Sequence, residues 1–228
     1  MSSTKPPTYP VNLCLDTTPV LVVGAGEVAL RKVRGLLAAG ARVTVVAPEV
    51  HPELVALARD KQIELQRRPY PTGLAMEYRL VFAATGDEKV DWLVSYDAAT
   101  VGIFVNVADV PEQCSFYLPA VVRRGHLQLA VSSDGGAPFA ARRLRKRLEA
   151  QFGESYRQWL DSAAVFRAAV LESGLSPEQQ EQLFDRFFNE TLPPAPESGQ
   201  PTVLDETTWR GWIQANQADS GHEGEADG

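Results

Sequence analysis

The chain has 228 residues, is 44% hydrophobic and carries a formal net charge of −7. This composition is typical of a globular protein with one good core and a smaller second one, and the longest apolar runs have the length of strands, which argues against a membrane span. Residues from 191 onward carry a net −6, so the rest of the chain is nearly neutral and indicates no nucleic-acid partner.

The cysteines and the first residues predict a cytoplasmic protein. Cys14 and Cys114 are too few and too far apart for a metal knuckle or a disulfide scaffold. Residues 1–7 lack the apolar core of a signal peptide.

A glycine turn between a strand and a helix is the most informative motif. An apolar strand at 20–23 runs through Gly24 and Gly26 into a helix, where the small Ala29 allows close packing. Gly24 can turn sharply, Gly26 has no Cβ to block a phosphate, and the helix N-terminus offers free N–H groups. A second strand at 42–46 completes a unit of about 30 residues, which favours dinucleotide binding over a purely structural turn.

Glu49 follows the second strand, about 20 residues after the glycine turn, where dinucleotide sites place the carboxylate that holds the ribose hydroxyls. Its charge would repel the extra phosphate of NADP, so we predict NAD. The alternative is that Glu49 caps the helix beginning near 51–52, because carboxylates favour helix N-termini. Three basic residues keep NADP possible as the cofactor: Arg31, Lys32 and Arg42.

Strands and helices alternate as far as about Asp109. This alternation predicts an α/β fold with a Rossmann-like parallel sheet, whose ligand lies at the carboxyl ends of the strands. The ends of the fourth and fifth strands, 83–87 and 106–109, should then face the same cleft as the glycine turn. The five strands are expected at 20–23, 42–46, 63–66, 80–84 and 103–107.

The alternation stops after Asp109. Residues 115–123 and 127–131 read as antiparallel strands joined by a hairpin turn at Arg124-Gly125. This apolar hairpin has no helix of its own to cover it, so we expect it to pair with a second subunit in a homodimer. The alternative is that it packs on its own chain.

A basic helix follows, with Pro138 in its first turn. A run of bases on a helix is usually a solvated face. The alternative is a site for a polyanionic small molecule, because guanidinium groups pair bidentately with carboxylates. The bases are Arg142, Arg143, Arg145, Lys146 and Arg147, and the apolar side carries Phe139, Leu144, Leu148 and Phe152.

Two helices and an acidic tail complete the chain. A capping box at Ser176 and Gln179 starts the second helix. In the tail, Trp209 and Trp212 could dock one short helix, and the last dozen residues are expected to be disordered. The predicted domains are a dinucleotide-binding domain (1–111), a β dimerisation segment (112–138), a helical substrate-side domain (139–190) and a mostly disordered tail (191–228).

Few side chains are placed for catalysis. No histidine stands in a catalytic pattern, Ser133 has no obvious base, and the sequence has no metal-ligand cluster. Asp109 is the best candidate, because it follows the fifth strand at the expected cleft and could act as a general base if it is partly buried. The alternative is that Asp109 organises Val110-Pro111 as an Asx turn.

The ordered set of motifs over about 10–190 resembles the siroheme-synthase family. It comprises Val-Val-Gly-Ala-Gly-Glu-Val-Ala-x-Arg-Lys (22–32), Val-Val-Ala-Pro-Glu (45–49), Ala-Ala-Thr (83–85), Asn-Val-Ala-Asp-Val-Pro (106–111), Ser-Phe-x-x-Pro-Ala (115–120) and Val-Ser-Ser (131–133).

The resemblance implies NAD-dependent oxidation of precorrin-2 to sirohydrochlorin, with Asp109 as the base and, in some members, metal insertion by the same site. It implies NAD contacts at Gly24, Gly26, Glu27, Val28, Pro48, Glu49 and Thr85. For the polycarboxylate substrate we expect Asn106, Ser133, Arg142, Arg143 and Arg145.

A non-catalytic alternative rests on the glycine turn and on 84–88. These stretches also resemble nucleotide-sensing domains that regulate potassium transport. In such domains the alternation should continue with a further helix and strand, whereas here it breaks into a hairpin and a basic helix. The break favours the enzyme.

Overall fold

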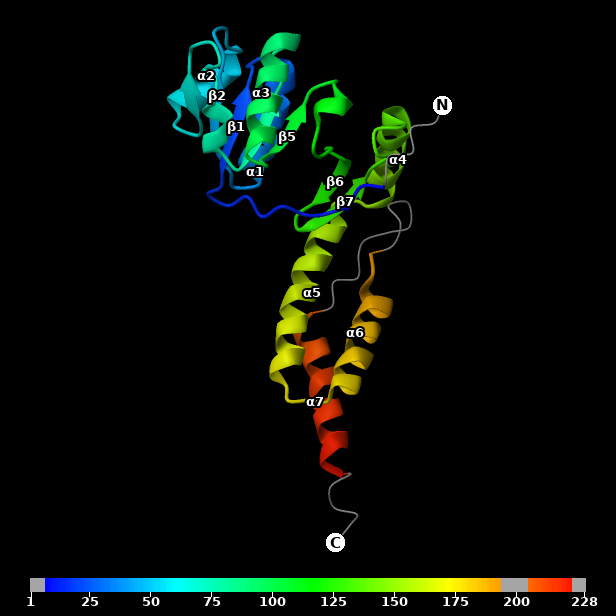
Figure 1. Ribbon diagram of the computed structural model, residues 1–228. Coiled ribbons are helices and arrows are strands. Elements are labelled where there is room, and N and C mark those ends of the chain that lie inside the picture. The colour runs from blue at the N-terminus through cyan, green and yellow to red at the C-terminus, as the bar shows by residue number, and fades with distance from the viewer. Residues whose placement is uncertain (1–6, 194–204, 223–228) are drawn as a thin grey trace. The chain divides into compact units, whose positions relative to one another are not determined.

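The computed structural model describes residues 7–193 and 205–222 (Figure 1). The chain forms two compact units that divide between Leu118 and Pro119. The first predicted domain boundary, after residue 111, falls close to this division. The finer division of the second unit stays a prediction.

The first unit is a five-stranded parallel sheet with the order β3-β2-β1-β4-β5. The order reverses direction at β1, which makes the gap between the loops after β1 and β4 the expected ligand position. The strands are β1 (Pro19–Val23), β2 (Arg42–Val46), β3 (Glu64–Gln66), β4 (Leu80–Ala83) and β5 (Phe104–Val107).

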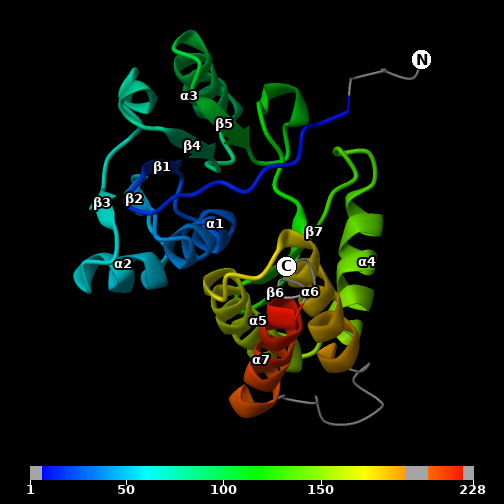
Figure 2. The ribbon, with the colours of Figure 1, turned by 90° about the horizontal axis from the view of Figure 1, so that it is seen from below.

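Helices cover both faces of this sheet, as Figure 2 shows, so its central strands are almost continuously apolar. Leu30 and Val33 of one helix and Leu54 of the next pack on one face. Val94 and Ala98 of a third helix pack on the other. The helices are α1 (Glu27–Ala38), α2 (Pro52–Arg59) and α3 (Glu88–Thr100), with short 3-10 turns η1 (Leu74–Glu77) and η2 (Pro111–Gln113).

The second unit contains the predicted hairpin, formed by β6 (Ala120–Arg124) and β7 (Leu127–Val131). Its first strand begins later than the expected 115–123, and Arg124 pairs with Leu127, so the turn is Gly125-His126 rather than Arg124-Gly125. Gly125 makes its turn with a positive φ of 58°. Of the two strands, only Val122 is fully buried. The expectation that no helix covers the hairpin is wrong, because α4 packs against both strands and α5 against β7. Val121, on the other face, stays 38% exposed.

The basic helix is α4 (Pro138–Gln151). Its apolar side is less covered than the sequence pattern suggests, because Phe139 and Leu144 are both more than half exposed and only Ala141 is buried. None of the helices in the described ranges is long and apolar enough to cross a bilayer.

Three helices lie side by side in the rest of the unit: α5 (Ser155–Glu172), α6 (Pro177–Thr191) and α7 (Glu206–His222) (Figures 1 and 2). Phe166 is at the centre of their core, stacked on Phe187 at 4.6 Å between ring centroids. The predicted capping box at Ser176 and Gln179 starts α6.

The described part of the tail after residue 204 is largely helical, whereas 194–204 lie outside the described residues, so the expectation of a mostly disordered tail stays a prediction. The predicted docking of Trp209 and Trp212 is confirmed, because both indoles are buried in the core around Phe166. However, the helix that they anchor is 17 residues long, since the buried indole area offsets the cost of ordering an acidic segment. Of the expected disordered stretch, 223–228 lie outside the described residues.

Candidate functional site

The loops after β1 and β4 touch at the carboxyl edge of the sheet. Gly24 has a φ of 99°, and a Cβ there would lie 2.2 Å from the carbonyl oxygen of Ala84. The Gly24 amide donates to the carbonyl of Val46 at 2.9 Å, and the Ala108 amide donates to the carbonyl of Ala83 at 2.9 Å. The ends of β1, β2, β4 and β5 therefore meet at one edge, as the topology predicted.

The N-terminus of α1 is open to an anion. Gly26 is its N-cap and contributes no side chain, so no capping group competes for the first N–H groups. A Cβ at Gly26 would have no neighbour within 4 Å. Glu27 is exposed and Val28 is half-buried beside this turn. The geometry fits a pyrophosphate group.

Thr85 is held in place by a residue that the sequence analysis missed. The carboxylate of Asp91, in the first turn of α3, accepts a hydrogen bond from the Thr85 hydroxyl at 2.7 Å and another from its amide at 3.2 Å. Asp91 is 5% exposed. An aspartate six residues after Thr85 was the available signal, but it is also a common residue in a first helical turn.

The loop after β2 places Pro48 and Glu49 at the surface. The proposed capping role of Glu49 is wrong, because His51 is the N-cap of α2 and its Nδ1 accepts from the Glu53 amide. His51 Nε2 also lies 2.9 Å from the carboxylate of Glu27. Glu49 has no such structural partner among the described residues, so it is free to bind a ligand.

Two of the three basic residues that left NADP possible as the cofactor lie away from Glu49. Arg42 begins β2 and so lies at the opposite end of that strand from Glu49. The Lys32 side chain is directed to β5, where its Nζ donates to Asn106 Oδ1 at 2.9 Å.

Asp109 lies just beyond β5 in a left-handed conformation with a φ of 61°. The partial burial suggested for it is not found, because β5 is an edge strand and its end is open to solvent; Asp109 is exposed. Its side chain makes no hydrogen bond to Val110, to Pro111 or to any other described residue, so the Asx-turn alternative is not observed. Its carboxylate acts electrostatically on the Lys32 ammonium.

Asn106 does not present its amide to solvent. It is 7% exposed, its Oδ1 accepts from Lys32, and its Nδ2 donates to the carbonyl of Phe116 at 3.1 Å. Direct substrate contact by Asn106 therefore has no support in this geometry, and the residue instead fixes Lys32.

The remaining predicted residues belong to the second unit. Ser133 accepts a hydrogen bond from the Ala137 amide at 3.1 Å, which orders the loop before α4. Arg142 and Arg143 are exposed, whereas Arg145 pairs with Glu149 at 2.8 Å. Of these three guanidinium groups, those of Arg142 and Arg143 are available to an anionic ligand.

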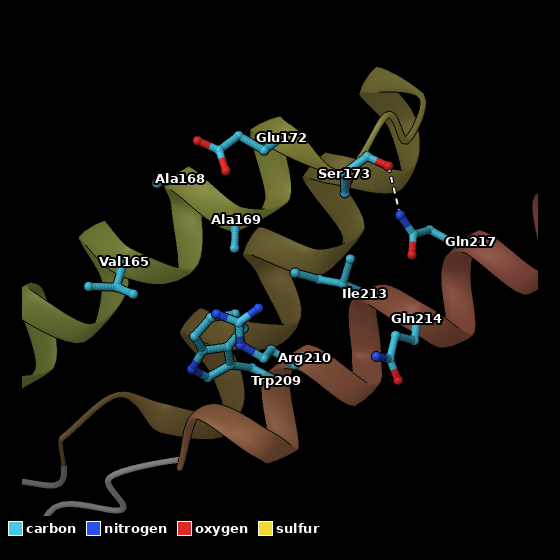
Figure 3. Close-up of a pocket in the computed structure, with 10 residues that line it drawn as sticks. All are labelled: Val165, Ala168, Ala169, Glu172, Ser173, Trp209, Arg210, Ile213, Gln214 and Gln217. Carbon is cyan, nitrogen blue, oxygen red and sulfur yellow. Dashed lines mark hydrogen bonds between the residues drawn. The ribbon is translucent and has the colours of Figure 1, made fainter.

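A groove between α5 and α7, with a volume of about 420 Å³, holds none of these residues (Figure 3). Its walls include Val165, Ala169 and Ile213, and Gln217 donates to the Ser173 carbonyl at one end (Figure 3). Within 7–193 and 205–222, no three histidine, cysteine or acidic side chains gather in a way that could hold a metal ion.

Both units of the chain match known protein families. Residues 11–120 match the family described as "Putative NAD(P)-binding", and residues 124–151 match "Sirohaem biosynthesis protein central".

Among curated relatives, siroheme synthase 1 of Aeromonas salmonicida (strain A449) is 41% identical over 180 residues, 79% of this chain and 38% of the relative. The siroheme synthase of Pseudomonas paraeruginosa (strain DSM 24068 / PA7) is 46% identical over 172 residues, 75% of this chain and 36% of the relative. The chain thus spans less than two fifths of the length of these relatives. The solved structure of SirC, precorrin-2 dehydrogenase, has a TM-score of 0.72 at 26% identity and covers 92% of this chain and 100% of its own.

Proposed function

We propose that this chain, which belongs to the siroheme synthase family, oxidises precorrin-2 to sirohydrochlorin with NAD as the hydride acceptor. The observation that carries the proposal is the carboxyl edge of the parallel sheet. The open N-terminus of α1 follows β1, the loop with Thr85 follows β4, and Asp109 follows β5. The likeness to a precorrin-2 dehydrogenase over the whole of that chain supports it.

The first unit fits a dinucleotide. Gly24 and Gly26 leave room for the pyrophosphate, the N–H groups at the start of α1 donate to it, and Glu49 is free to accept from the ribose hydroxyls. Val28, Pro48 and Thr85 lie around the same loops, and Glu27 is held there by His51. Bound NAD supplies an acceptor for the hydride that leaves the substrate.

Asp109 takes the proton. Oxidation of precorrin-2 to sirohydrochlorin removes a hydride and a proton, so a base must accept the proton as the new double bond forms. Asp109 is exposed at the end of β5 and has no hydrogen-bond partner among the described residues, so its carboxylate is available to the substrate.

The second unit supplies cations for the substrate. Precorrin-2 carries eight carboxylates, and the exposed Arg142 and Arg143 of α4 match that charge. Arg145 can contribute only by exchanging its pairing with Glu149. Ser133 orders the loop that precedes this helix.

Exposed apolar residues of the hairpin and of α4 support a homodimer. Val121 of β6 and Phe139 and Leu144 of α4 are between 38% and 60% exposed, which is apolar surface that association would bury. Sedimentation equilibrium tests this: a dimer is expected for the wild type and a monomer for Val121→Asp. A monomeric wild type at micromolar concentration contradicts the dimer.

We also propose a cytoplasmic location, supported by the fact that Cys14 and Cys114 are not joined in a disulfide. The nucleotide-sensing alternative has no observation in its favour, since the chain after β5 enters a two-stranded antiparallel sheet rather than a further strand of the parallel one.

The test is an anaerobic incubation with precorrin-2 and NAD, followed by the absorbance of sirohydrochlorin and NADH. We expect both products, and we expect Asp109→Ala to lower kcat by about 10²- to 10⁴-fold with the affinity for NAD unchanged. Asp60→Ala, an exposed aspartate at the end of α2, is the matched control. A fully active Asp109→Ala protein contradicts its role, and a wild type without turnover contradicts the function. Addition of ferrous or cobaltous ion afterwards tests metal insertion.

A further inference from the structure

Lys32 is a cation held inside the first unit rather than released to solvent. It lies in the middle of α1 and is half-buried. Its Nζ donates to Asn106 Oδ1 at 2.9 Å and lies 5.2 Å from the centroid of the Phe82 ring. Burial lowers the pKa of Lys32, and the nearby Arg31 lowers it further, whereas the charges of Cys114 and Asp109 raise it.

The partner of Lys32 is itself fixed. Asn106 Nδ2 donates to the Phe116 carbonyl at 3.1 Å and to Cys114 Sγ at 3.6 Å. The orientation of the amide therefore presents its oxygen, and not its nitrogen, to Lys32. An aliphatic side chain could fill the same space beside Phe82, so packing alone does not explain an ammonium group here.

The ammonium group is incompletely paired. It has three donors, and Asn106 is its one hydrogen-bond acceptor in the described part of the chain. No carboxylate of those residues lies within 4.0 Å of its Nζ. A half-buried cation without a close anion is costly, and an anion that bound to it would remove that cost.

We propose that Lys32 binds a carboxylate of the tetrapyrrole substrate. This inference rests on the proposed function and adds a substrate contact in the first unit. A dinucleotide phosphate is the other possible source of an anion, but its expected place is the N-terminus of α1 at Gly26. Lys32 comes six positions after Gly26, which is about 9 Å along the helix axis, and its side chain is directed to β5.

The site also determines how the substrate is oriented. Asn106 lies on β5 three residues before Asp109, so a carboxylate held by Lys32 is bound close to the proposed base. One peripheral carboxylate anchored there restricts which edge of the macrocycle faces Asp109. Asn106 is then a positioning residue for Lys32.

The test measures the affinity of the full chain for sirohydrochlorin by absorbance titration, with NAD affinity measured in parallel by calorimetry. The variants are Lys32→Met, Lys32→Gln and Lys32→Arg, and Lys89→Met, an exposed lysine of α3, is the control. We expect Met and Gln to raise the Kd for sirohydrochlorin about tenfold to a hundredfold, the range for a lost charge-assisted hydrogen bond. Arg should stay within about threefold of the wild type, and the Kd for NAD should not change.

Each other outcome has a distinct meaning. If Lys32→Met binds sirohydrochlorin as tightly as Lys89→Met does, the inference is wrong. If instead the Kd for NAD rises in Lys32→Met and Lys32→Gln, the anion is a cofactor phosphate and the inference is also wrong. If either of these outcomes is found and the wild type still oxidises precorrin-2, the proposed function stands and only the inference about Lys32 fails. A wild type that neither binds nor oxidises the tetrapyrrole contradicts both the proposed function and the inference.

Discussion

The carboxylate of Asp91 accepts hydrogen bonds from both the amide and the hydroxyl of Thr85. Thr85 in turn accepts from the Asp87 amide at 3.0 Å, and Asp87 caps α3. A buried side chain of the helix thus fixes the loop that lies against Gly24. The position of the loop therefore depends on a residue that does not itself reach the edge of the sheet.

We therefore predict that Asp91→Ala raises the Kd for NAD about tenfold and lowers the free energy of unfolding by about 1–3 kcal/mol, the cost of leaving buried donors unpaired. Asp91→Asn keeps an oxygen acceptor and should recover most of the affinity. Calorimetric titration with NAD and urea unfolding measure the two effects. Equal affinities for Asp91→Ala and the wild type would show that the loop does not need this carboxylate.

Gly24 and Gly26 should respond differently to alanine. At Gly24 the new Cβ would lie 2.2 Å from the Ala84 carbonyl oxygen, on a backbone with a φ of 99°, so we expect Gly24→Ala to destabilise the first unit by several kcal/mol, on the order of 3. At Gly26 the Cβ has open space. Gly26→Ala should fold like the wild type and lose NAD affinity, because the Cβ occupies the path of the pyrophosphate. Thermal unfolding and NAD titration separate these effects. If Gly26→Ala binds NAD as tightly as the wild type does, the pyrophosphate does not bind beside Gly26.

The arginines of α4 should not be equivalent. Arg142→Gln and Arg143→Gln remove exposed charges and should each weaken sirohydrochlorin binding about three- to tenfold. The Kd of each variant should also depend less on added salt than the Kd of the wild type does. Arg145→Gln should have less effect, since its guanidinium group already pairs with Glu149 at 2.8 Å. Absorbance titrations at two salt concentrations test the order. If Arg145→Gln has the largest effect, the Glu149 pair must open on binding.

Tyr70 should make stability depend on alkaline pH. Its hydroxyl donates to Asp97 at 2.7 Å and accepts from the Ala75 amide at 3.0 Å. Burial, with the hydrogen bond to Asp97, raises the pKa of Tyr70 above its ordinary value of 10.0. The folded protein therefore keeps this proton at a pH where the unfolded chain loses it, so the stabilisation is complete below about pH 10 and declines as the pH rises further.

Tyr70→Phe has no such proton. The difference in free energy of unfolding between the wild type and Tyr70→Phe should be constant up to about pH 9 and then shrink. The lowered pKa of Lys32 acts in the opposite direction, but it is common to both proteins and cancels. Urea unfolding at a series of pH values measures the difference. A gap that widens above pH 10 would contradict the direction given for Tyr70.

Local sequence predicted the elements well, because their signals lie within a few residues. The β-branched run Arg42–Val46 is a strand with those bounds, and Ser176 and Gln179 form the capping box that their spacing predicted. Gly24 also lies where the strand-to-helix motif placed it. These features depend on neighbours in the chain.

The missed features depend on contacts between distant segments. Nothing next to Lys32 indicates that its partner is Asn106, 74 residues later. His51 precedes a proline, and its contact with Glu27 forms only when α1 and α2 lie on the same face of the sheet. The exposure of Asp109 was mispredicted because β5 is the edge strand, and no single sequence motif indicates the strand order.

The distribution of the four tryptophans gives each unit its own optical signal. Trp92 is 53% exposed on α3 and is the one indole of the first unit, whereas Trp159, Trp209 and Trp212 pack around Phe166 and Phe187 in the second. Emission from Trp92 should be red-shifted and readily quenched by acrylamide, and the emission of the other three should be blue-shifted and protected. Replacing Trp92 by Phe would leave fluorescence that reports on the helices alone, so the melting of the two halves could be followed separately in one intact protein.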